Sequence, residues 1–303
     1  QSGVKKIFED KEFAKELKEK GLQLSSANSI NIGRLIPQVV YYVYAYAKLY
    51  ARGELKKGER VNVAVPTGNF GNILAAYIAK QMGIPFDRLI CASNDNRVLY
   101  DFFTTGTYDR NREFILTTSP SMDILISSNL ERLLYLSCKR DAAKTKELMQ
   151  ELSQSGKYSV TSEMKEFMSD FYAGYAGMKE NAAEIKKIYE DTGYLIDTHT
   201  GVAAAVYEAY KRENGDQKKT IIASTASPYK FAGSVVEAVL GKQATEASSS
   251  DEFARIEQVR ELSGVKIPQA IEELRGATIL HNRQCGPKEM KETVKSIFSN
   301  EKK

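Results

Sequence analysis

The sequence has few cysteines and no metal-ligand motif, and these absences exclude several classes of protein. Its three cysteines are Cys91, Cys138 and Cys285, an odd number of residues spread far apart along the 303-residue chain. This pattern argues against a disulfide framework or a zinc site and fits reduced thiols in a reducing compartment. The sequence therefore predicts a cytoplasmic protein without a bound metal.

Long hydrophobic runs and clusters of one charge sign are also absent. The most apolar stretch, Ile36 to Tyr50, contains Pro37, Gln38 and Lys48, so it falls short of the continuous apolar span that a bilayer needs. We expect a buried helix there and no membrane association. The net charge of +4 arises from interleaved charges of both signs, as on solvated helix faces, so no nucleic-acid partner is predicted.

What the sequence does contain is an alternation of strand, turn and helix signals. Short β-branched runs that lead through polar or glycine-rich turns into helical stretches occur at 60–66, 194–197 and 220–223, and a further strand is expected at 89–92. This order predicts an α/β fold with a doubly wound, mostly parallel sheet and helices on both faces. In such folds ligands bind outside the carboxyl ends of the strands.

The strongest local signal is the turn formed by Gly68, Asn69, Phe70, Gly71 and Asn72. Two glycines let the backbone curl closely and direct successive amides into one concavity, and the following helix adds its positive end. The turn therefore suggests an anion cradle. It has no lysine and is not a Walker loop, and a purely structural strand-to-helix turn remains an open alternative.

Three further segments carry polar groups at strand ends or helix starts. The hydroxyl-rich turn Ser224 to Pro228 can contact a heteroaromatic nitrogen or cap a helix, and the same choice applies to Asp197, His199 and Thr200. Asn28, Ser29, Asn31 and Arg34 precede or open the long helix expected at about 32–52, where phosphate recognition and simple capping both fit. The segment Ser119 to Asp123 looks like a turn and a helix start without a role that can be derived locally.

Five ordered motifs together resemble threonine synthases of the long bacterial and fungal type. They are the segment from Asn28 to Arg34, the turn 68–72, residues 119–124 with 127–129, residues 197–201, and residues 224–231. The resemblance runs from about residue 23 to residue 231 and more loosely to the end. It implies the fold type II architecture of pyridoxal-phosphate (PLP) enzymes, with helical additions, and a lyase that converts O-phospho-L-homoserine and water to L-threonine and phosphate.

Site roles follow from this resemblance. The amides of Gly68, Asn69, Phe70, Gly71 and Asn72 are expected to hold the phosphate of PLP, and Thr225 to contact its pyridine nitrogen. Asn28, Ser29, Asn31 and Arg34 are expected to bind the substrate phosphate. Ser227 and Tyr229 stand where many relatives have histidine and alanine, so no role is assigned to Ser227. The resemblance also implies three parts: a helical segment 1–58 packing on the cofactor domain, an α/β domain 59–240 with a helical insertion at about 125–190, and a helix-rich tail 241–303.

One expected feature has no counterpart. The family carries its Schiff-base lysine in a phenylalanine-lysine-aspartate segment, and no such tripeptide occurs in this sequence. Lys11 lies on a charged helix face and is no substitute. The interpretation is that an N-terminal region of roughly two-fifths of the enzyme is absent. No catalytic residue is therefore assigned in this chain, and we expect the chain to be inactive alone. We also expect it to expose apolar surface on the helix Ile36 to Tyr50.

Three hypotheses follow. The first is a threonine synthase portion that needs the N-terminal region of the same protein for activity. The second is a non-catalytic remnant or scaffold protein that kept the phosphate or PLP site. The third is a related lyase or dehydratase with a different amino-acid substrate, which would share the cradle and differ at Asn28 to Arg34.

Overall fold

The computed structural model describes residues 2–25, 31–243, 251–280 and 282–299. By their internal contacts the described residues form two compact units, one lying within residues 1–27 and 269–303 and the other within residues 28–268. The larger unit contains the sheet and nearly all of the motifs described above. The three parts expected from the sequence (1–58, 59–240 and 241–303) have different boundaries from these two units, and that division stays a prediction.

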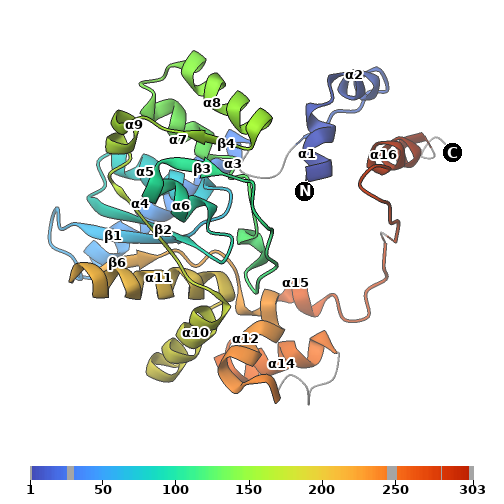
Figure 1. Ribbon diagram of the computed structural model, residues 1–303. Coiled ribbons are helices and arrows are strands. Elements are labelled where there is room, and N and C mark those ends of the chain that lie inside the picture. Colours follow the sequence, from blue (N-terminus) through green and yellow to red (C-terminus); the bar gives the residue numbers. More distant parts are fainter. Residues whose placement is uncertain (1, 26–30, 244–250, 281, 300–303) are drawn as a thin grey trace. The chain divides into compact units, whose positions relative to one another are not determined.

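A four-stranded parallel sheet forms the centre of the larger unit, in the order β5-β2-β1-β6 (Figure 1). The strands are β1 (Val61–Pro66), β2 (Phe86–Ser93), β5 (Phe171–Tyr175) and β6 (Thr220–Ile222). All six residues of β1 are buried, as expected of a central strand covered on both faces. The predicted parallel α/β fold is confirmed.

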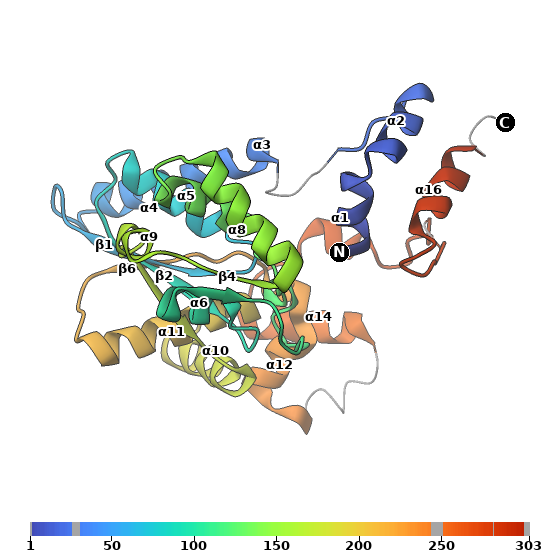
Figure 2. The same cartoon turned by 45° about the horizontal axis from the view of Figure 1, so that its top comes forward.

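Helices cover both faces of this sheet, as Figures 1 and 2 show. On one face a hydrophobic core joins the sheet to α4 (Val39–Ala51), α5 (Gly71–Gln81), α6 (Val98–Thr105), α7 (Leu130–Ser137), α8 (Ala142–Ser155) and α9 (Ser162–Phe167). On the other face α11 (Thr198–Asn214) packs its Val202, Ala203 and Val206 on Ala64 and Ile90. Both layers are therefore set by alternate side chains of the same strands.

The remaining elements of this unit are short or peripheral. A two-stranded antiparallel ribbon pairs β3 (Thr107–Asp109) with β4 (Lys157–Ser159). The others are α3 (Ile32–Leu35), η1 (Ile36–Gln38), η2 (Pro120–Met122), α10 (Met178–Thr192), η3 (Pro228–Phe231), α12 (Ala232–Leu240) and α14 (Glu252–Ser263).

Two predicted elements need correction. The strand expected at 194–197 is irregular backbone that leads into α11, because Asp197 caps that helix by accepting from the amides of His199 and Thr200. The single helix expected at about 32–52 consists of α3, η1 and α4. Pro37 lies within η1, and a proline has no backbone N–H to continue a regular helix.

The smaller unit contains α1 (Ser2–Glu9), α2 (Lys11–Glu19), α15 (Gln269–Glu272) and α16 (Met290–Ser299). Phe13 is fully buried there, and the ammonium groups of Lys291 and Lys295 lie 5.2 and 5.8 Å from its ring centre. Lys291 also pairs with Asp10 at 2.7 Å and Lys295 with Glu16 at 2.9 Å. Segments from the two ends of the chain thus pack together as one unit.

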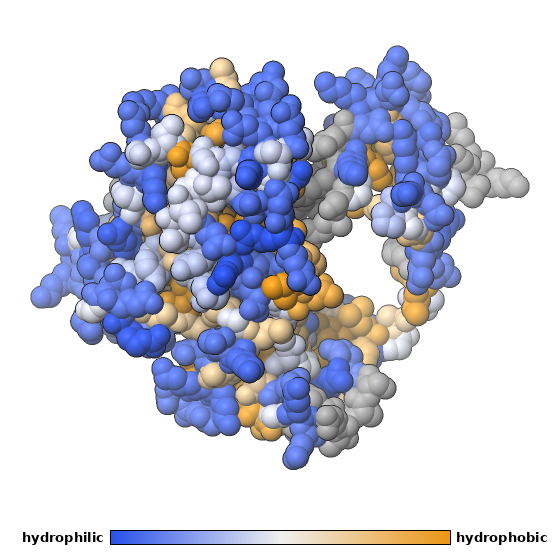
Figure 3. Space-filling view, viewed as in Figure 1, coloured by the Kyte–Doolittle hydropathy of each residue, from blue (hydrophilic) through white to orange (hydrophobic). Residues whose placement is uncertain are grey.

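The surface is mostly hydrophilic on the face shown in Figure 3. By exposure alone, and independently of that view, apolar and aromatic side chains gather on the outer face of η1 and α4, where Ile36, Val40, Tyr41 and Tyr44 are each about half or more exposed (49%, 62%, 60% and 59%). The helix expected to be buried over 36–50 is thus buried on one face only, where Val39 and Tyr42 enter the core, and the exposed apolar surface expected there is present. No helix in the described parts of the chain is long and apolar enough to cross a membrane.

Candidate cofactor and substrate site

The turn between β1 and α5 is the best-defined part of the site. The backbone of Phe70 is left-handed (φ 64°), although it is not a glycine, and the residue directly precedes α5. A left-handed non-glycine residue costs roughly 1–2 kcal/mol. The cost is offset by packing, because the Phe70 ring is buried and lies 5.6 Å from the ring of Phe171 and 6.0 Å from that of Phe103.

This backbone leaves a row of amides unpaired. Within the described residues, the N–H groups of Gly68, Asn69, Phe70, Gly71 and Asn72 donate no hydrogen bond to the protein. The last of them open α5, whose N-terminus adds partial positive charge. Successive amides on a left-handed turn at a helix N-terminus form a concavity suited to an anion such as a phosphate.

Gly68 is required by a close backbone approach. A Cβ atom at this position would lie 2.6 Å from the carbonyl oxygen of Ser121 and 3.3 Å from the Cα of Met122. Both neighbours are backbone atoms that cannot move aside without shifting the segment 119–123. The glycine therefore lets this segment pack directly against the turn.

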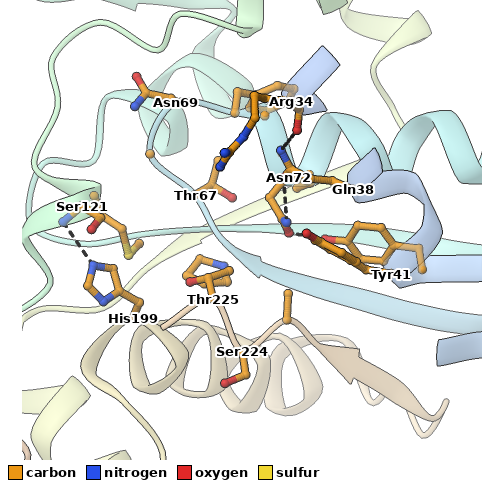
Figure 4. A pocket seen from close by; sticks show the side chains of 18 of the residues that line it. Arg34, Gln38, Tyr41, Thr67, Asn69, Asn72, Ser121, His199, Ser224 and Thr225 are labelled. Carbon is orange, nitrogen blue, oxygen red and sulfur yellow. Dashed lines mark hydrogen bonds between the residues drawn. The ribbon is translucent and has the colours of Figure 1, made fainter. Parts of the chain in front are cut away.

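A cavity of about 900 Å³ lies in front of the turn. It is lined by residues of the turn (66–73), of the segment 33–45, of Ser121 and Met122, of His199, and of the end of β6 (221–225). Figure 4 shows Asn69, Asn72, Ser121, His199 and Thr225 around this space. The carboxyl ends of β1 and β6 and the start of α11 thus converge on one cavity, as parallel sheets favour.

The four residues predicted to bind the substrate phosphate lie in different places. Arg34 is exposed and lines the cavity. Asn31 caps α3 by accepting from the Gly33 amide at 2.9 Å, and it is not among the described residues that line the cavity. Asn28 and Ser29 lie outside the described residues. The substrate-binding role of all four stays a prediction.

A chain of hydrogen bonds joins Arg34 to the cradle. The side-chain amide of Gln38 donates to the Arg34 carbonyl at 2.8 Å, and its oxygen accepts from Asn72 Nδ2 at 3.0 Å (Figure 4). The other side-chain atom of Asn72, Oδ1, accepts from the Tyr42 hydroxyl. These bonds hold the Asn72 side chain in place and link the segment 34–42 to the start of α5.

His199 forms the opposite wall and is buried at 2% exposure. Its Nε2 accepts a hydrogen bond from the Ser121 amide at 3.1 Å, which places the proton of a neutral imidazole on Nδ1, 3.2 Å from Asp197 Oδ1. Burial raises the pKa of Asp197, but hydrogen bonds from His199 and Thr200 outweigh it and hold that pKa below the usual aspartate value. His199 therefore links the cap of α11 to the segment 119–123.

The end of β6 supplies the hydroxyl groups. Ser224 and Thr225 are both exposed and line the cavity, and Ser224 Oγ lies 3.3 Å from Thr200 Oγ1. Ser227 caps η3 by accepting from the Tyr229 amide at 3.3 Å. Thr225 is thus available to a ligand, whereas Ser227 has the structural role of a cap.

The sequence did not identify Gln38 and Tyr42 as residues of the site. Their contact with Asn72 joins positions 30 or more residues apart, so no local motif indicates it. The sequence offers one hint that Gln38 belongs to the site: it lies one helical turn after Arg34, and residues four apart share a helix face.

Comparisons with known proteins agree with this geometry. A family model described as the C-terminal region of threonine synthase matches residues 200–279. Human threonine synthase-like 1 is 46% identical over 253 residues, which are 82% of this chain and 34% of that protein. Threonine synthase of Saccharomyces cerevisiae is 38% identical over 253 residues, covering 78% of this chain and 48% of that protein.

Solved structures give the same result. The crystal structure of yeast threonine synthase matches with a TM-score of 0.79 and 32% identity, covering 99% of this chain and 57% of that one. A PLP-bound threonine synthase from Brucella melitensis matches with a TM-score of 0.71 and 37% identity, covering 98% and 56%. The chain therefore spans between about one third and one half of the curated relatives named here. It belongs to the threonine synthase family.

Proposed function

We propose that this chain is the cofactor-binding portion of a threonine synthase, which converts O-phospho-L-homoserine and water to L-threonine and phosphate with the help of PLP. The observation that carries the proposal is the row of unpaired amides from Gly68 to Asn72 at the start of α5, facing a cavity of about 900 Å³. Family membership makes PLP the cofactor that fits such a cradle.

The residues present fit a phosphorylated pyridine. The cradle amides would hold the phosphate, and the hydroxyl of Thr225 would meet the ring nitrogen without placing a charge on it. Arg34, together with Asn28, Ser29 and Asn31, would bind the substrate phosphate. When bound, PLP supplies an electron sink for negative charge that develops on the substrate.

Catalysis needs a group from elsewhere. Among the described residues that line the cavity there is no lysine, and PLP enzymes hold their cofactor through a lysine Schiff base. We propose that a lysine-bearing portion, such as the one present in the longer relatives, completes the site. The same observation favours the second candidate, a non-catalytic remnant that binds PLP or phosphate.

The test begins with the 303-residue chain and PLP. Titration followed by absorbance and by competition with inorganic phosphate should show saturable binding that phosphate displaces. The N-terminal portion of a threonine synthase is then supplied on the same or a second chain, and threonine formation from O-phospho-L-homoserine is measured. Threonine formation supports the enzyme portion; PLP binding without it supports the remnant. Failure to bind PLP or phosphate contradicts both.

A further inference from the structure

The segment 119–129 carries motif residues for which the sequence gave no local role. In the structure, its second half contacts the carbonyl side of the β1–α5 turn. The Ser127 hydroxyl donates to the Gly68 carbonyl at 2.7 Å. Asn129 donates twice to the Asn69 carbonyl, from its backbone amide at 3.0 Å and from Nδ2 at 2.8 Å.

These bonds determine which way the amides of the turn point. In a planar trans peptide the carbonyl of one residue and the N–H of the next point in opposite directions. Ser127 holds the Gly68 carbonyl and Asn129 holds the Asn69 carbonyl, while the Phe70 carbonyl accepts from the Leu74 amide in α5 at 3.0 Å. The N–H groups of the three following residues, 69, 70 and 71, therefore face away from these partners, and all three residues line the cavity.

The segment is itself fixed at both ends. The Tyr108 hydroxyl accepts from the Ser127 amide at 2.9 Å and donates to the Leu125 carbonyl at 3.0 Å. Near the other end, Asp123 Oδ1 accepts from Asn94 Nδ2 at 2.8 Å and from Thr117 Oγ1 at 2.7 Å. A buried network can hold a functional group more precisely than a loop held by one contact.

We infer that Ser127 and Asn129 are positioning residues that aim the cradle amides at a bound phosphate. Neither side chain lines the cavity among the described residues, and both are buried, at 5% and 0% exposure. They act through the Gly68 and Asn69 carbonyls and not by touching the ligand. The inference rests on the proposed function, because it takes the cradle to be the phosphate site.

The decisive experiment compares Ser127→Ala with Ser137→Ala in the 303-residue chain. Ser137 is a matched control, because this residue is also 5% exposed. Its hydroxyl likewise donates to a backbone carbonyl, that of Leu134 at 2.8 Å, but within α7 and away from the cradle. Affinities for PLP, inorganic phosphate and unphosphorylated pyridoxal are measured by titration, with melting temperatures alongside.

Ser127→Ala is expected to weaken binding of PLP and inorganic phosphate about fivefold, which corresponds to one lost hydrogen bond, and to leave pyridoxal binding unchanged. Ser137→Ala should lower the melting temperature similarly without changing any affinity. Ser127→Thr keeps the hydroxyl and should restore phosphate affinity. If Ser127→Ala does not fold, Asn129→Ser provides the same comparison. The shorter serine side chain cannot replace the bond from Asn129 Nδ2 to the Asn69 carbonyl.

The outcomes separate the two proposals. Equal affinities for the Ser127 and Ser137 variants, or a loss of pyridoxal binding equal to that of PLP, would overturn the positioning role and leave the proposed function intact. No binding of PLP or phosphate by the unmodified chain would overturn both. A selective loss of phosphate-dependent affinity that the threonine variant restores supports the inference.

Discussion

The two strand ends that meet at the cavity differ in how firmly they are held. The turn after β1 follows a fully buried central strand and has its carbonyls bonded by Ser127 and Asn129. The turn after β6 follows a three-residue strand that, among the described residues, pairs only with β1, and its Ser224 and Thr225 are exposed. Under the proposed function, the firmly held turn is the site for the cofactor phosphate and the weakly held turn is the site for its ring.

The largest expected effect is on the firmly held turn. Gly68→Ala places a Cβ 2.6 Å from the Ser121 carbonyl oxygen, so the turn or the segment 119–123 must shift. Overpacking of this kind costs about 1–3 kcal/mol. Because both close neighbours are backbone atoms, we expect the upper part of that range, about 2–3 kcal/mol, which corresponds to a roughly 30- to 150-fold loss of affinity for PLP and inorganic phosphate. Titration of both ligands measures this effect.

Gly233→Ala is the matched control for that substitution. Gly233 lies in α12, and an added Cβ would meet only the flexible side chain of Arg255, at 3.4 Å. Since alanine favours helices over glycine by roughly 0.5–1 kcal/mol, this variant should be as stable as the unmodified chain or slightly more stable, with unchanged affinities. If both glycine variants bind equally well, the close approach at Gly68 is not what shapes the cradle.

A smaller effect is expected at the start of α11, where His199 bonds to the Ser121 amide and Thr200 contacts Ser224. Burial raises the pKa of Asp197, but hydrogen bonds from His199 and Thr200 lower it by more, so the pKa lies below the usual aspartate value. A carboxyl with a depressed pKa stabilises the fold above its unfolded pKa of about 3.9 and loses this contribution as the pH falls through the folded pKa. Asp197→Asn should therefore lower the free energy of unfolding by about 2 kcal/mol at pH 7.

The pH dependence is the diagnostic part of this prediction. The difference in unfolding free energy between Asp197→Asn and the unmodified chain should shrink below about pH 4, as measured by denaturant unfolding over a pH series. Asp251, an exposed cap of α14 that accepts from the Phe253 amide at 3.0 Å, supplies the control. Because asparagine caps helices as well as aspartate, Asp251→Asn should change stability by about 0.3 kcal/mol or less. If the difference in unfolding free energy between Asp197→Asn and the unmodified chain persists at low pH, the carboxylate charge is not what stabilises the fold.

The smallest effect is expected at the weakly held turn. Thr225→Val removes an exposed hydroxyl and preserves the side-chain shape, so stability should not change. We expect PLP affinity to fall about threefold through the lost contact with the ring, with inorganic phosphate affinity unchanged. Thr225→Ser retains the hydroxyl and should bind PLP normally. A loss of inorganic phosphate affinity in Thr225→Val would break the distinction between the two turns.

Sequence reasoning succeeded where the signal was local. The strand at 61–66, its glycine turn and α5 form one continuous pattern, and the structure has all three. The predicted strand at 194–197 failed because buried Leu195 and Ile196 resemble a strand, although they are apolar residues leading into a capped helix. β5 lies in a region expected to be mostly helical, since a five-residue strand between helices has little periodicity of its own.

The support of the cradle could not be predicted for a different reason. Ser127 and Asn129 stand in a recognisable motif, but their partners are Gly68 and Asn69, and only the folded chain brings these groups together. Likewise, nothing near Gly68 in the sequence indicates that Ser121 packs against it. Motifs therefore identified which segments matter, while the contacts between segments required the fold.

The bonds that aim the cradle also bear on how the protein folds. They connect residues 59 and 60 positions apart, and contacts of this separation form slowly because a long loop must close first. A growing or refolding chain that has completed only β1 and α5 would have the glycine turn without its supports. Phosphate affinity should consequently appear late in refolding, after helical content, which makes ligand binding a reporter of when the segment 119–129 reaches its native place.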